Sequence, residues 1–240
     1  MNETLLHTSG LAVGFGRTAL ISGIDLTLEP GECILLCGAN GSGKTTLMRT
    51  LAGLLRPMAG SLSFAPGLAE RTVLIPTRIP KVPGFTLREF IRLSCYRESG
   101  WDGRLHASAE AAISQALELL EISALTTSDI ATLSDGEFQK GCIATALVRI
   151  FARNQEADGL ILLDEPTAFL DVEGRTQVLH TLRRLADQTG TTLLFSSHDL
   201  IDSAAVATRI LGIAPDHTLL DSAEGADVLT ACFPSWHPGL

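Results

Sequence analysis

The sequence GANGSGKT at residues 38–45 fits the spacing G-x-x-x-x-G-K-[ST] of a phosphate-binding loop. Glycines let such a loop turn tightly and point successive backbone N–H groups at a phosphate, and a helix beginning near Lys44 adds the positive end of its dipole. Lys44 can reach the β- and γ-phosphate oxygens, and Thr45 can offer its hydroxyl to Mg²⁺. The segment therefore predicts that a nucleoside triphosphate binds at Gly38, Asn40, Gly41, Ser42, Gly43, Lys44, Thr45 and Thr46.

The residues on either side indicate which elements position this loop. Residues 33–37 form a continuous apolar run, typical of a buried parallel strand, and Leu47, Leu51 and Leu54 recur at helical spacing after the loop. The alternative is a glycine turn with a chance lysine. The order of strand, loop and helix favours the phosphate loop.

A second group of reactive side chains follows the apolar run at residues 160–163. Asp164 and Glu165 stand there, before Pro166, and the carboxyl end of a buried parallel strand is where open α/β sheets place their ligands. Asp164, with Thr45, would hold Mg²⁺, and Glu165 would orient and deprotonate the water that attacks the γ-phosphate. The alternative is an acidic pair that begins a helix at Pro166. Beside a phosphate loop, the pair favours hydrolysis.

The remaining pattern predicts an α/β core with two additions. Short β-like runs near the N-terminus indicate antiparallel strands, and a mostly helical stretch in the middle carries Ile113, Leu117 and Leu120 on one stripe. From residue 160 onward, apolar runs alternate with helical patterns, which predicts a parallel sheet. The N-terminal runs are 11–15 and 24–28, the helical stretch is 86–125, the later strands are 160–163, 192–195 and 210–213, and the later helices are 172–186 and 201–207.

Composition narrows the class of protein. A chain of 240 residues with 45% hydrophobic and 19% charged residues can bury one large core or two modest ones. Its formal net charge of −9 argues against a DNA or RNA partner, since nucleic-acid affinity depends on clustered Lys and Arg.

The N-terminus has no signal-peptide pattern and no 18 apolar residues run together, so we expect a soluble chain inside the cell. Five cysteines without C-x-x-C spacing predict buried, reduced thiols.

The sequence LSDGE at residues 133–137 completes the pattern, and with it the chain resembles the ATP-binding subunits of ABC transporters. The family signature is LSGGQ, so Asp135 replaces a glycine and Glu137 replaces the glutamine. Ser134 and the Gly136 backbone, at a helix start, would form a second anion cradle. The alternative is an ordinary helix start. The resemblance implies that the cradle closes on the γ-phosphate bound by another subunit.

Three more residues match positions of this family. The resemblance implies that Phe15 stacks on adenine, that Asp171 lies in a loop crossing a dimer seam, and that His198 contacts the γ-phosphate as a catalytic residue. Each has a plainer alternative: Phe15 as a core residue, Asp171 as the cap of a turn into a helix, and His198 as a structural histidine. The family usually has a glutamine where this chain has Thr77, whose shorter side chain leaves the role of that position open.

The resemblance implies an α/β fold in which a phosphate-loop core with a parallel sheet carries an antiparallel β subdomain and an inserted helical subdomain. Residues 1–240 would form one ABC ATPase domain, with the helical subdomain at about 86–140. It also implies two ATP molecules, with Mg²⁺, buried in a head-to-tail homodimer that drives a transmembrane permease. A substrate-binding protein would act indirectly. The chain would then be peripheral, on the cytoplasmic face of the inner membrane.

The motifs look most like those of importers for iron-siderophores, haem or vitamin B12. Residues 77–90 place charged side chains around apolar ones, a composition that suits a groove for a permease helix. The alternative is a surface loop stiffened by Pro76, Pro80 and Pro83. Another candidate is a soluble ABC ATPase in a nucleic-acid process, although such proteins usually carry two cassettes or a long coiled coil. A small-molecule kinase would not explain the signature or His198.

Overall fold

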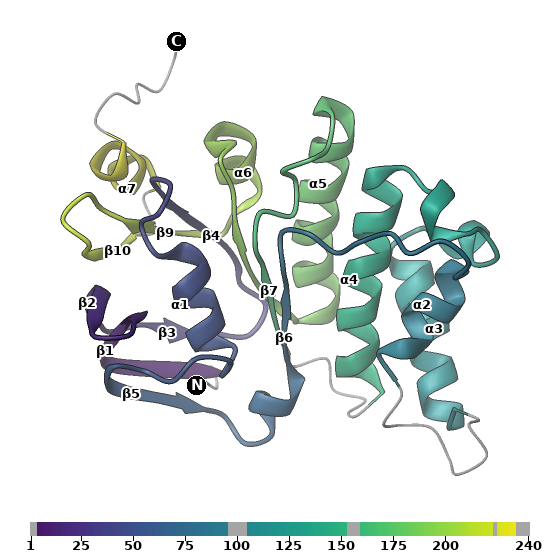
Figure 1. Cartoon of the computed structure of the whole chain (residues 1–240), viewed down its shortest axis with the longest axis horizontal. Coiled ribbons are helices and arrows are strands. Elements are labelled where there is room, and N and C mark those ends of the chain that lie inside the picture. Colours follow the sequence, from purple (N-terminus) through teal and green to yellow (C-terminus); the bar gives the residue numbers. More distant parts are fainter. Residues whose placement is uncertain (1–3, 96–104, 153–158, 223–224, 234–240) are drawn as a thin grey trace.

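Two β-sheets enclose a shared hydrophobic core in the computed structural model, which describes residues 4–95, 105–152, 159–222 and 225–233 (Figure 1). The larger sheet has six strands in the order β10-β9-β4-β8-β7-β6, and neighbours from β9 to β6 are parallel while β10 is antiparallel to β9. Its strands are β4 (Cys33–Gly38), β6 (Thr72–Ile75), β7 (Leu160–Leu163), β8 (Thr192–Ser196), β9 (Arg209–Ile213) and β10 (Leu219–Ser222).

The smaller sheet is antiparallel and is built around its longest strand. In it, β1 (Leu6–Phe15) pairs with β2 (Thr18–Ile24), β3 (Thr27–Leu28) and β5 (Ala59–Phe64). Between the two sheets lies α1 (Lys44–Leu51), whose Leu47, Met48 and Leu51 are fully buried. The predicted parallel core sheet and antiparallel β subdomain are confirmed.

Side-chain alternation along β4 explains how one strand supports two cores. Ile34 and Leu36 face the antiparallel sheet and α1, whereas Cys33, Leu35 and Cys37 belong to a second core formed with the helices on the opposite face. Successive residues of a strand point to opposite faces, so a strand apolar throughout must be covered on both. All five cysteines are free and buried, as predicted.

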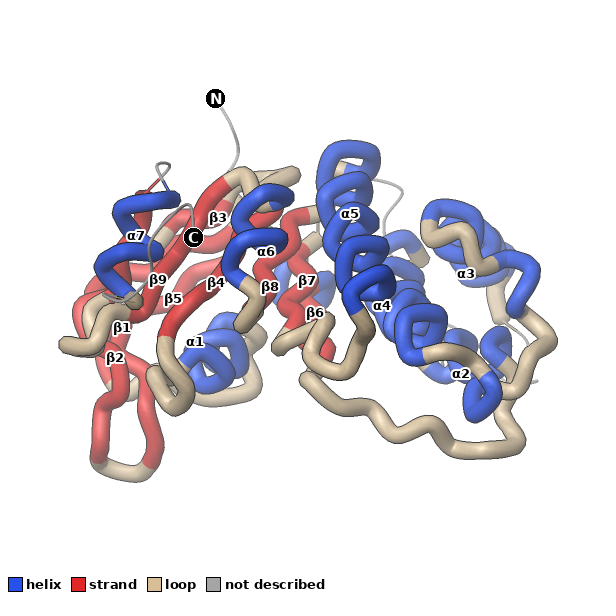
Figure 2. The backbone as a smooth tube through the Cα atoms, turned by 90° about the horizontal axis from the view of Figure 1, so that it is seen from above, coloured by secondary structure: helices blue, strands red, loops and turns tan. Residues whose placement is uncertain are grey.

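The helices that cover the second face include a separate group at one end of the molecule, beyond β6 and β7 (Figure 2). That group contains α2 (Leu87–Leu93), α3 (Ala107–Leu119) and the first turns of α4 (Asp135–Phe151). Its stripe of Ile113, Leu117 and Leu120 is buried, as its helical spacing indicates. The other helices are α5 (Val172–Thr189), α6 (Leu200–Val206) and α7 (Gly225–Cys232), and short 3₁₀ turns occupy Leu68–Arg71, Ser123–Leu125 and Ile130–Thr132. Among the described residues, no helix is long and apolar enough to cross a membrane.

Two local predictions were wrong. Residues 24–28 are not one strand, because the Thr8 hydroxyl donates to the Ile24 carbonyl and accepts from the Leu26 N–H, each at 2.9 Å, and these bonds break the run. Leu54 does not extend the apolar face of α1: the helix ends at Leu51, the chain reverses at Gly53 with φ 71°, and the Leu54 side chain is 65% exposed.

Candidate functional site

The phosphate loop lies between β4 and α1, where the sequence places it, and its glycines are required by the backbone. Gly41 has φ 77° and Gly43 has φ 109°, a region that favours glycine. A Cβ atom on Gly43 would lie 3.1 Å from the Ile21 side chain, and one on Gly38 would lie 2.9 Å from the Ser42 hydroxyl. The loop is therefore shaped by the strand and side chains around it.

Lys44 is the first residue of α1 and folds back over the loop. Its Nζ donates to the Gly38 carbonyl at 2.8 Å and to the Ala39 carbonyl at 3.1 Å, and the residue is only 6% exposed. Burial lowers the pKa of this ammonium group, while the nearby carboxylates of Glu165 and Asp164 oppose that shift. A buried cation held by two carbonyls is positioned to exchange them for the stronger acceptor oxygens of a phosphate.

Thr45 and Asp164 are brought into contact although 119 residues separate them. The Thr45 hydroxyl donates to Asp164 Oδ2 at 2.8 Å, and the Ser196 hydroxyl donates to Asp164 Oδ1 at 3.0 Å. Asp164 is 7% exposed. A threonine hydroxyl beside a buried carboxylate is the hard oxygen donor set that Mg²⁺ prefers when phosphate oxygens and water supply its other ligands. These residues fit the predicted metal.

Glu165 and His198 meet at the same edge of the sheet. His198 Nε2 lies 2.6 Å from Glu165 Oε1, and their side chains are 50% and 26% exposed. Glu165 has φ 50°, unusual for a residue other than glycine, and its backbone N–H donates to the Ser196 hydroxyl at 2.9 Å. The backbone is thus held in a conformation that separates the roles of two adjacent carboxylates: Asp164 faces Thr45 and Glu165 faces His198.

Ser196 joins the candidate site, although its sequence pattern did not single it out. Its hydroxyl contacts both Asp164 and the Glu165 backbone, so it fixes the two acidic residues relative to each other. The available signal was its position at the end of an apolar strand, at the edge where the other polar side chains gather.

The predicted second cradle lies at the start of α4, apart from the phosphate loop. The Ser134 hydroxyl accepts from the Glu137 N–H at 3.2 Å, and the Glu137 carboxylate accepts from the Ser134 N–H at 2.8 Å, which is a capping box. Ser134, Gly136 and Asp171 line one groove of about 540 Å³, and Asp171 caps α5 by accepting from the Gly174 N–H at 2.8 Å. No described phosphate-loop residue lines that groove.

The other predicted site residues differ in their exposure and in the groove that they line. Phe15 is 55% exposed at the end of β1, which excludes the core reading. Asn40 and Gly41 are exposed, whereas Thr46 is buried in the first turn of α1. Thr77 is half-buried and lines a groove of about 530 Å³ together with Glu165.

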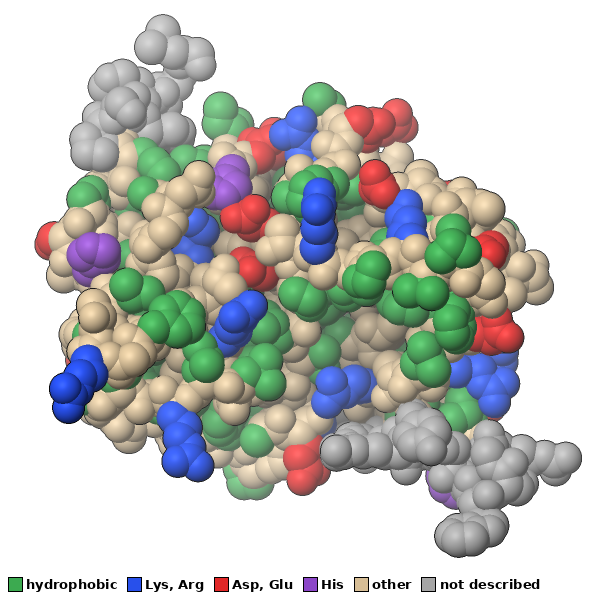
Figure 3. Space-filling model, viewed as in Figure 1, with side chains coloured by type: hydrophobic (Ala, Val, Ile, Leu, Met, Phe, Trp, Pro, Cys, Tyr) green, Lys and Arg blue, Asp and Glu red, His purple; other side chains and the backbone are tan. Residues whose placement is uncertain are grey.

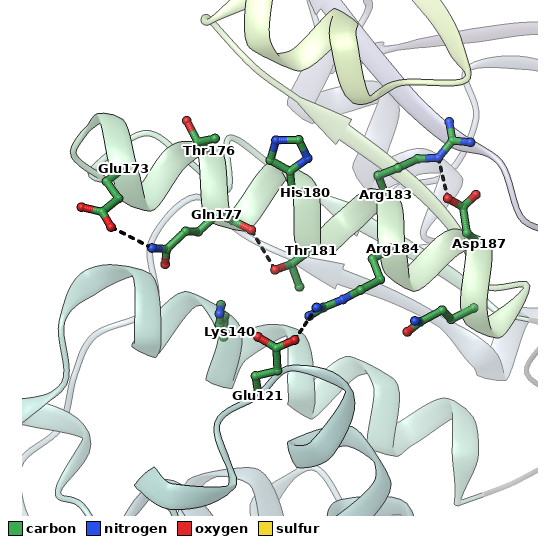
Figure 4. A pocket seen from close by; sticks show the side chains of 11 residues that line it. Glu121, Lys140, Glu173, Thr176, Gln177, His180, Thr181, Arg183, Arg184 and Asp187 are labelled. Atoms are coloured by element: carbon green, nitrogen blue, oxygen red, sulfur yellow. Dashed lines mark hydrogen bonds and ion pairs between the residues drawn. The ribbon is translucent and has the colours of Figure 1, made fainter.

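A further groove of about 1140 Å³ runs along α5 and contains none of the predicted site residues (Figure 4). There Arg184 points from α5 toward Glu121 and forms an ion pair with it, and it also donates to the Leu119 carbonyl at 3.1 Å. The groove therefore lies where the core contacts the group of helices around α3 and α4. Arg183 and Asp187, also in its lining, form an ion pair within α5.

Comparison with known proteins identifies a family. The family model described as "ABC transporter" matches residues 21–168. The hemin import ATP-binding protein HmuV of Rhodopseudomonas palustris is 34% identical over 219 residues, which cover 87% of this chain and 81% of that protein. The zinc import ATP-binding protein ZnuC of Pseudomonas putida is 36% identical over 203 residues, covering 83% and 71%. The probable siderophore transport system ATP-binding protein YusV of Bacillus subtilis is 28% identical, covering 89% and 78%.

Solved structures agree on the fold. A metal-chelate type ABC transporter in an inward-facing conformation superposes with a TM-score of 0.82 over 97% of this chain and 90% of that chain, at 23% identity. A nucleotide-free ATP-binding cassette superposes with a TM-score of 0.75 at 19% identity. The fold predicted from the motifs, and the likeness to import ATP-binding proteins of the hemin and siderophore group, are confirmed, and zinc importers join that group.

Proposed function

Because the chain belongs to the ABC transporter family and is an ATPase of that family, we propose that it is the subunit that binds and hydrolyses ATP for an importer of a metal or metal chelate. The observation that carries the proposal is the meeting of Thr45, Asp164, Glu165 and His198 at the carboxyl edge of the parallel sheet, beside the phosphate loop. That edge is where open α/β sheets bind ligands.

Each group has a distinct role in the reaction we propose. The phosphate-loop N–H groups and Lys44 hold the β- and γ-phosphates, and Thr45 and Asp164 hold Mg²⁺, which when bound neutralises charge on the transferred phosphoryl group. Glu165 accepts the proton of the attacking water. His198, 2.6 Å from Glu165, orients that carboxylate and reaches toward the γ-phosphate. Phe15, exposed at the end of β1, offers its ring to adenine.

We propose that two copies complete each site in a head-to-tail homodimer. In the cradle, Ser134 is exposed and Gly136 is half-buried, and both line a groove apart from the phosphate loop, so the cradle is available to a nucleotide bound by another copy. Asp171, at the rim of the same groove, would lie at the seam. In this proposal residues 1–240 form one ATPase domain, with the helices of about residues 86–140 as an inserted subdomain.

The permease would dock on residues 77–90, which we name the docking segment. Hydrophobic side chains gather where the loop from β6 to α2 crosses the face in Figure 3, with Lys and Arg side chains among them. In this segment Val82 is 48% exposed and Phe85 is 38% exposed. The loop is held in shape, because the Ile130 N–H donates to the Phe85 carbonyl at 2.9 Å. An apolar surface with a polar rim suits a partner helix.

Phe85→Asp tests the docking segment. A charge at the centre of an apolar contact should cut membrane recruitment and uptake by about tenfold or more, while ATP hydrolysis by the purified chain persists. Leu54→Asp is the matched control, because Leu54 is 65% exposed outside the segment and should leave recruitment unchanged. Undiminished pull-down of the permease by Phe85→Asp would remove the docking segment from the proposal and leave the ATPase assignment intact.

The cargo is proposed from likeness alone, because an ATPase subunit does not touch the cargo. Hemin, siderophore and zinc import proteins among the relatives favour an iron chelate, haem or a metal ion. The chain would be peripheral, on the cytoplasmic face of the inner membrane, with a substrate-binding protein acting on the far side and no nucleic acid involved.

One experiment tests the function as a whole. The tagged chain is purified from gently solubilised membranes, its partners are identified, and uptake of hemin, a ferric siderophore and Zn²⁺ is compared with a deletion strain. The proposal expects a co-purified permease and loss of uptake of one of these cargoes. Recovery with nucleic acid and without any membrane protein would favour the soluble ABC ATPase instead.

A further inference from the structure

The start of α4 carries two carboxylates where the proposed function needs an anion to bind. Asp135 and Glu137 both lie in the first turn of the helix, and Asp135 stands where the family signature has a glycine. Negative side chains stabilise a helix N-terminus, but they repel an incoming polyphosphate. Glu137 is engaged in the capping box with Ser134. The remaining question is how the charge of Asp135 is tolerated.

Lys81 engages Asp135 from the docking segment. Its Nζ lies 2.7 Å from Asp135 Oδ1 and donates to the Leu133 carbonyl at 2.7 Å. The same ammonium group lies 5.5 Å from the centre of the Phe138 ring. Three residues of one helix start therefore surround one cation. The Lys81 side chain is 24% exposed and that of Asp135 is 61% exposed, so the cation is the better shielded partner.

We propose that Lys81 is a positioning residue for the second cradle: by pairing with Asp135 and holding the Leu133 carbonyl, it keeps the start of α4 able to receive the γ-phosphate of ATP bound to a second copy. This inference rests on the proposed head-to-tail dimer. It also links the cradle to the docking segment, because Lys81 belongs to that segment. Its two partners, Leu133 and Asp135, lie 52 and 54 residues further along the chain.

The proposal predicts the direction in which each variant changes closure of the dimer. Without Lys81, the Asp135 carboxylate faces the triphosphate unpaired, so the closed dimer weakens while ATP binding to the monomer does not change. Without both side chains the repulsion is absent, and closure returns. If Lys81 only stabilised the fold, the second substitution would not restore closure, because removing Asp135 cannot restore the lost hydrogen bond to the Leu133 carbonyl.

The experiment measures turnover and dimerisation of Lys81→Ala, Lys81→Arg and the double variant Lys81→Ala/Asp135→Gly. We expect the KM for ATP to rise about fivefold in Lys81→Ala with little change in kcat, the scale of one partly exposed ion pair. The effect should shrink as salt screens the unpaired carboxylate. The double variant and Lys81→Arg should return to within about twofold of the parent. Arg183→Ala, which breaks the exposed pair with Asp187 on α5, is the matched control and should change neither value.

Dimerisation is followed by light scattering with ATP, with each variant also carrying Glu165→Gln to slow hydrolysis. An unchanged KM in Lys81→Ala, or a loss that Asp135→Gly does not restore, would overturn the inference. Ser134→Arg separates this result from a failure of the proposed function. If Ser134→Arg blocks dimerisation and Lys81→Ala does not, only the role of Lys81 is lost; if Ser134→Arg dimerises normally, the head-to-tail arrangement itself is wrong.

Discussion

The phosphate loop and the loop that begins α4 both lead into a helix N-terminus, but different forces hold them. The first follows a strand that is buried along its whole length, and it closes on its own lysine, Lys44. The second is exposed at Ser134 and Asp135 and is held by side chains: the capping box of Ser134 and Glu137, and the ion pair of Asp135 with Lys81. In our proposal, one cradle is therefore complete within a chain, and the other is open to a second copy.

This difference predicts which of the two loops a partner can influence. A loop fixed by packing binds in the same way whether or not a partner is present, because a close-packed core deforms little. A loop fixed by exposed polar contacts can be adjusted by whatever touches those contacts. In this molecule they reach, through Lys81, the segment on which we propose that the permease docks.

Glu165→Gln should give the largest effect. The amide keeps the shape of the side chain and leaves Asp164 on Mg²⁺, but it cannot accept a proton, so hydrolysis should fall by about 10²-fold or more. ATP should still bind, and the variant should accumulate as an ATP-bound dimer in gel filtration. A variant that hydrolyses ATP at the parental rate would contradict the assignment of the base.

Lys44→Ala and Ser134→Arg sharpen the comparison between the two loops. Loss of a charged hydrogen-bond donor should weaken ATP binding by the monomer by about tenfold or more in Lys44→Ala. Ser134→Arg should leave that affinity unchanged and block the dimer. Titration of monomer with a fluorescent ATP analogue, below the concentration at which dimers form, measures both. Equal losses of monomer affinity would mean that both loops serve one site in the same chain.

What the sequence could predict follows from how locally each feature is encoded. The phosphate loop and the Asp164-Glu165 pair were predictable because a phosphate and a metal demand fixed residue types within a few positions of a strand end. Ser196 and Lys81 were not, because their partners lie 31 or more residues away and no spacing rule links them. The break at residues 25–26 has the same origin, since it depends on the side chain of Thr8.

We expect the smallest effect from substitutions at two helix caps that use the same capping box. Thr86 caps α2 and Ser134 caps α4, each in a capping box with a glutamate three residues later. Replacing either by alanine should lower the free energy of unfolding by about 1 kcal/mol, measured by urea denaturation. Only Ser134→Ala should also weaken the ATP-driven dimer, because only that cap faces a nucleotide in our proposal.

The α2 cap also predicts how its contribution depends on pH. Hydrogen bonds from the Thr86 backbone and hydroxyl hold the pKa of Glu89 below its ordinary value. A carboxylate with a depressed folded pKa stabilises the fold above its unfolded pKa, and the contribution disappears as the pH falls through the folded pKa. The difference in stability between the parent and Thr86→Ala should therefore be constant near neutral pH and narrow in acid. Urea titrations of both proteins across that range measure this difference in the free energy of unfolding. A difference that did not change with pH would contradict the coupling of Thr86 to Glu89.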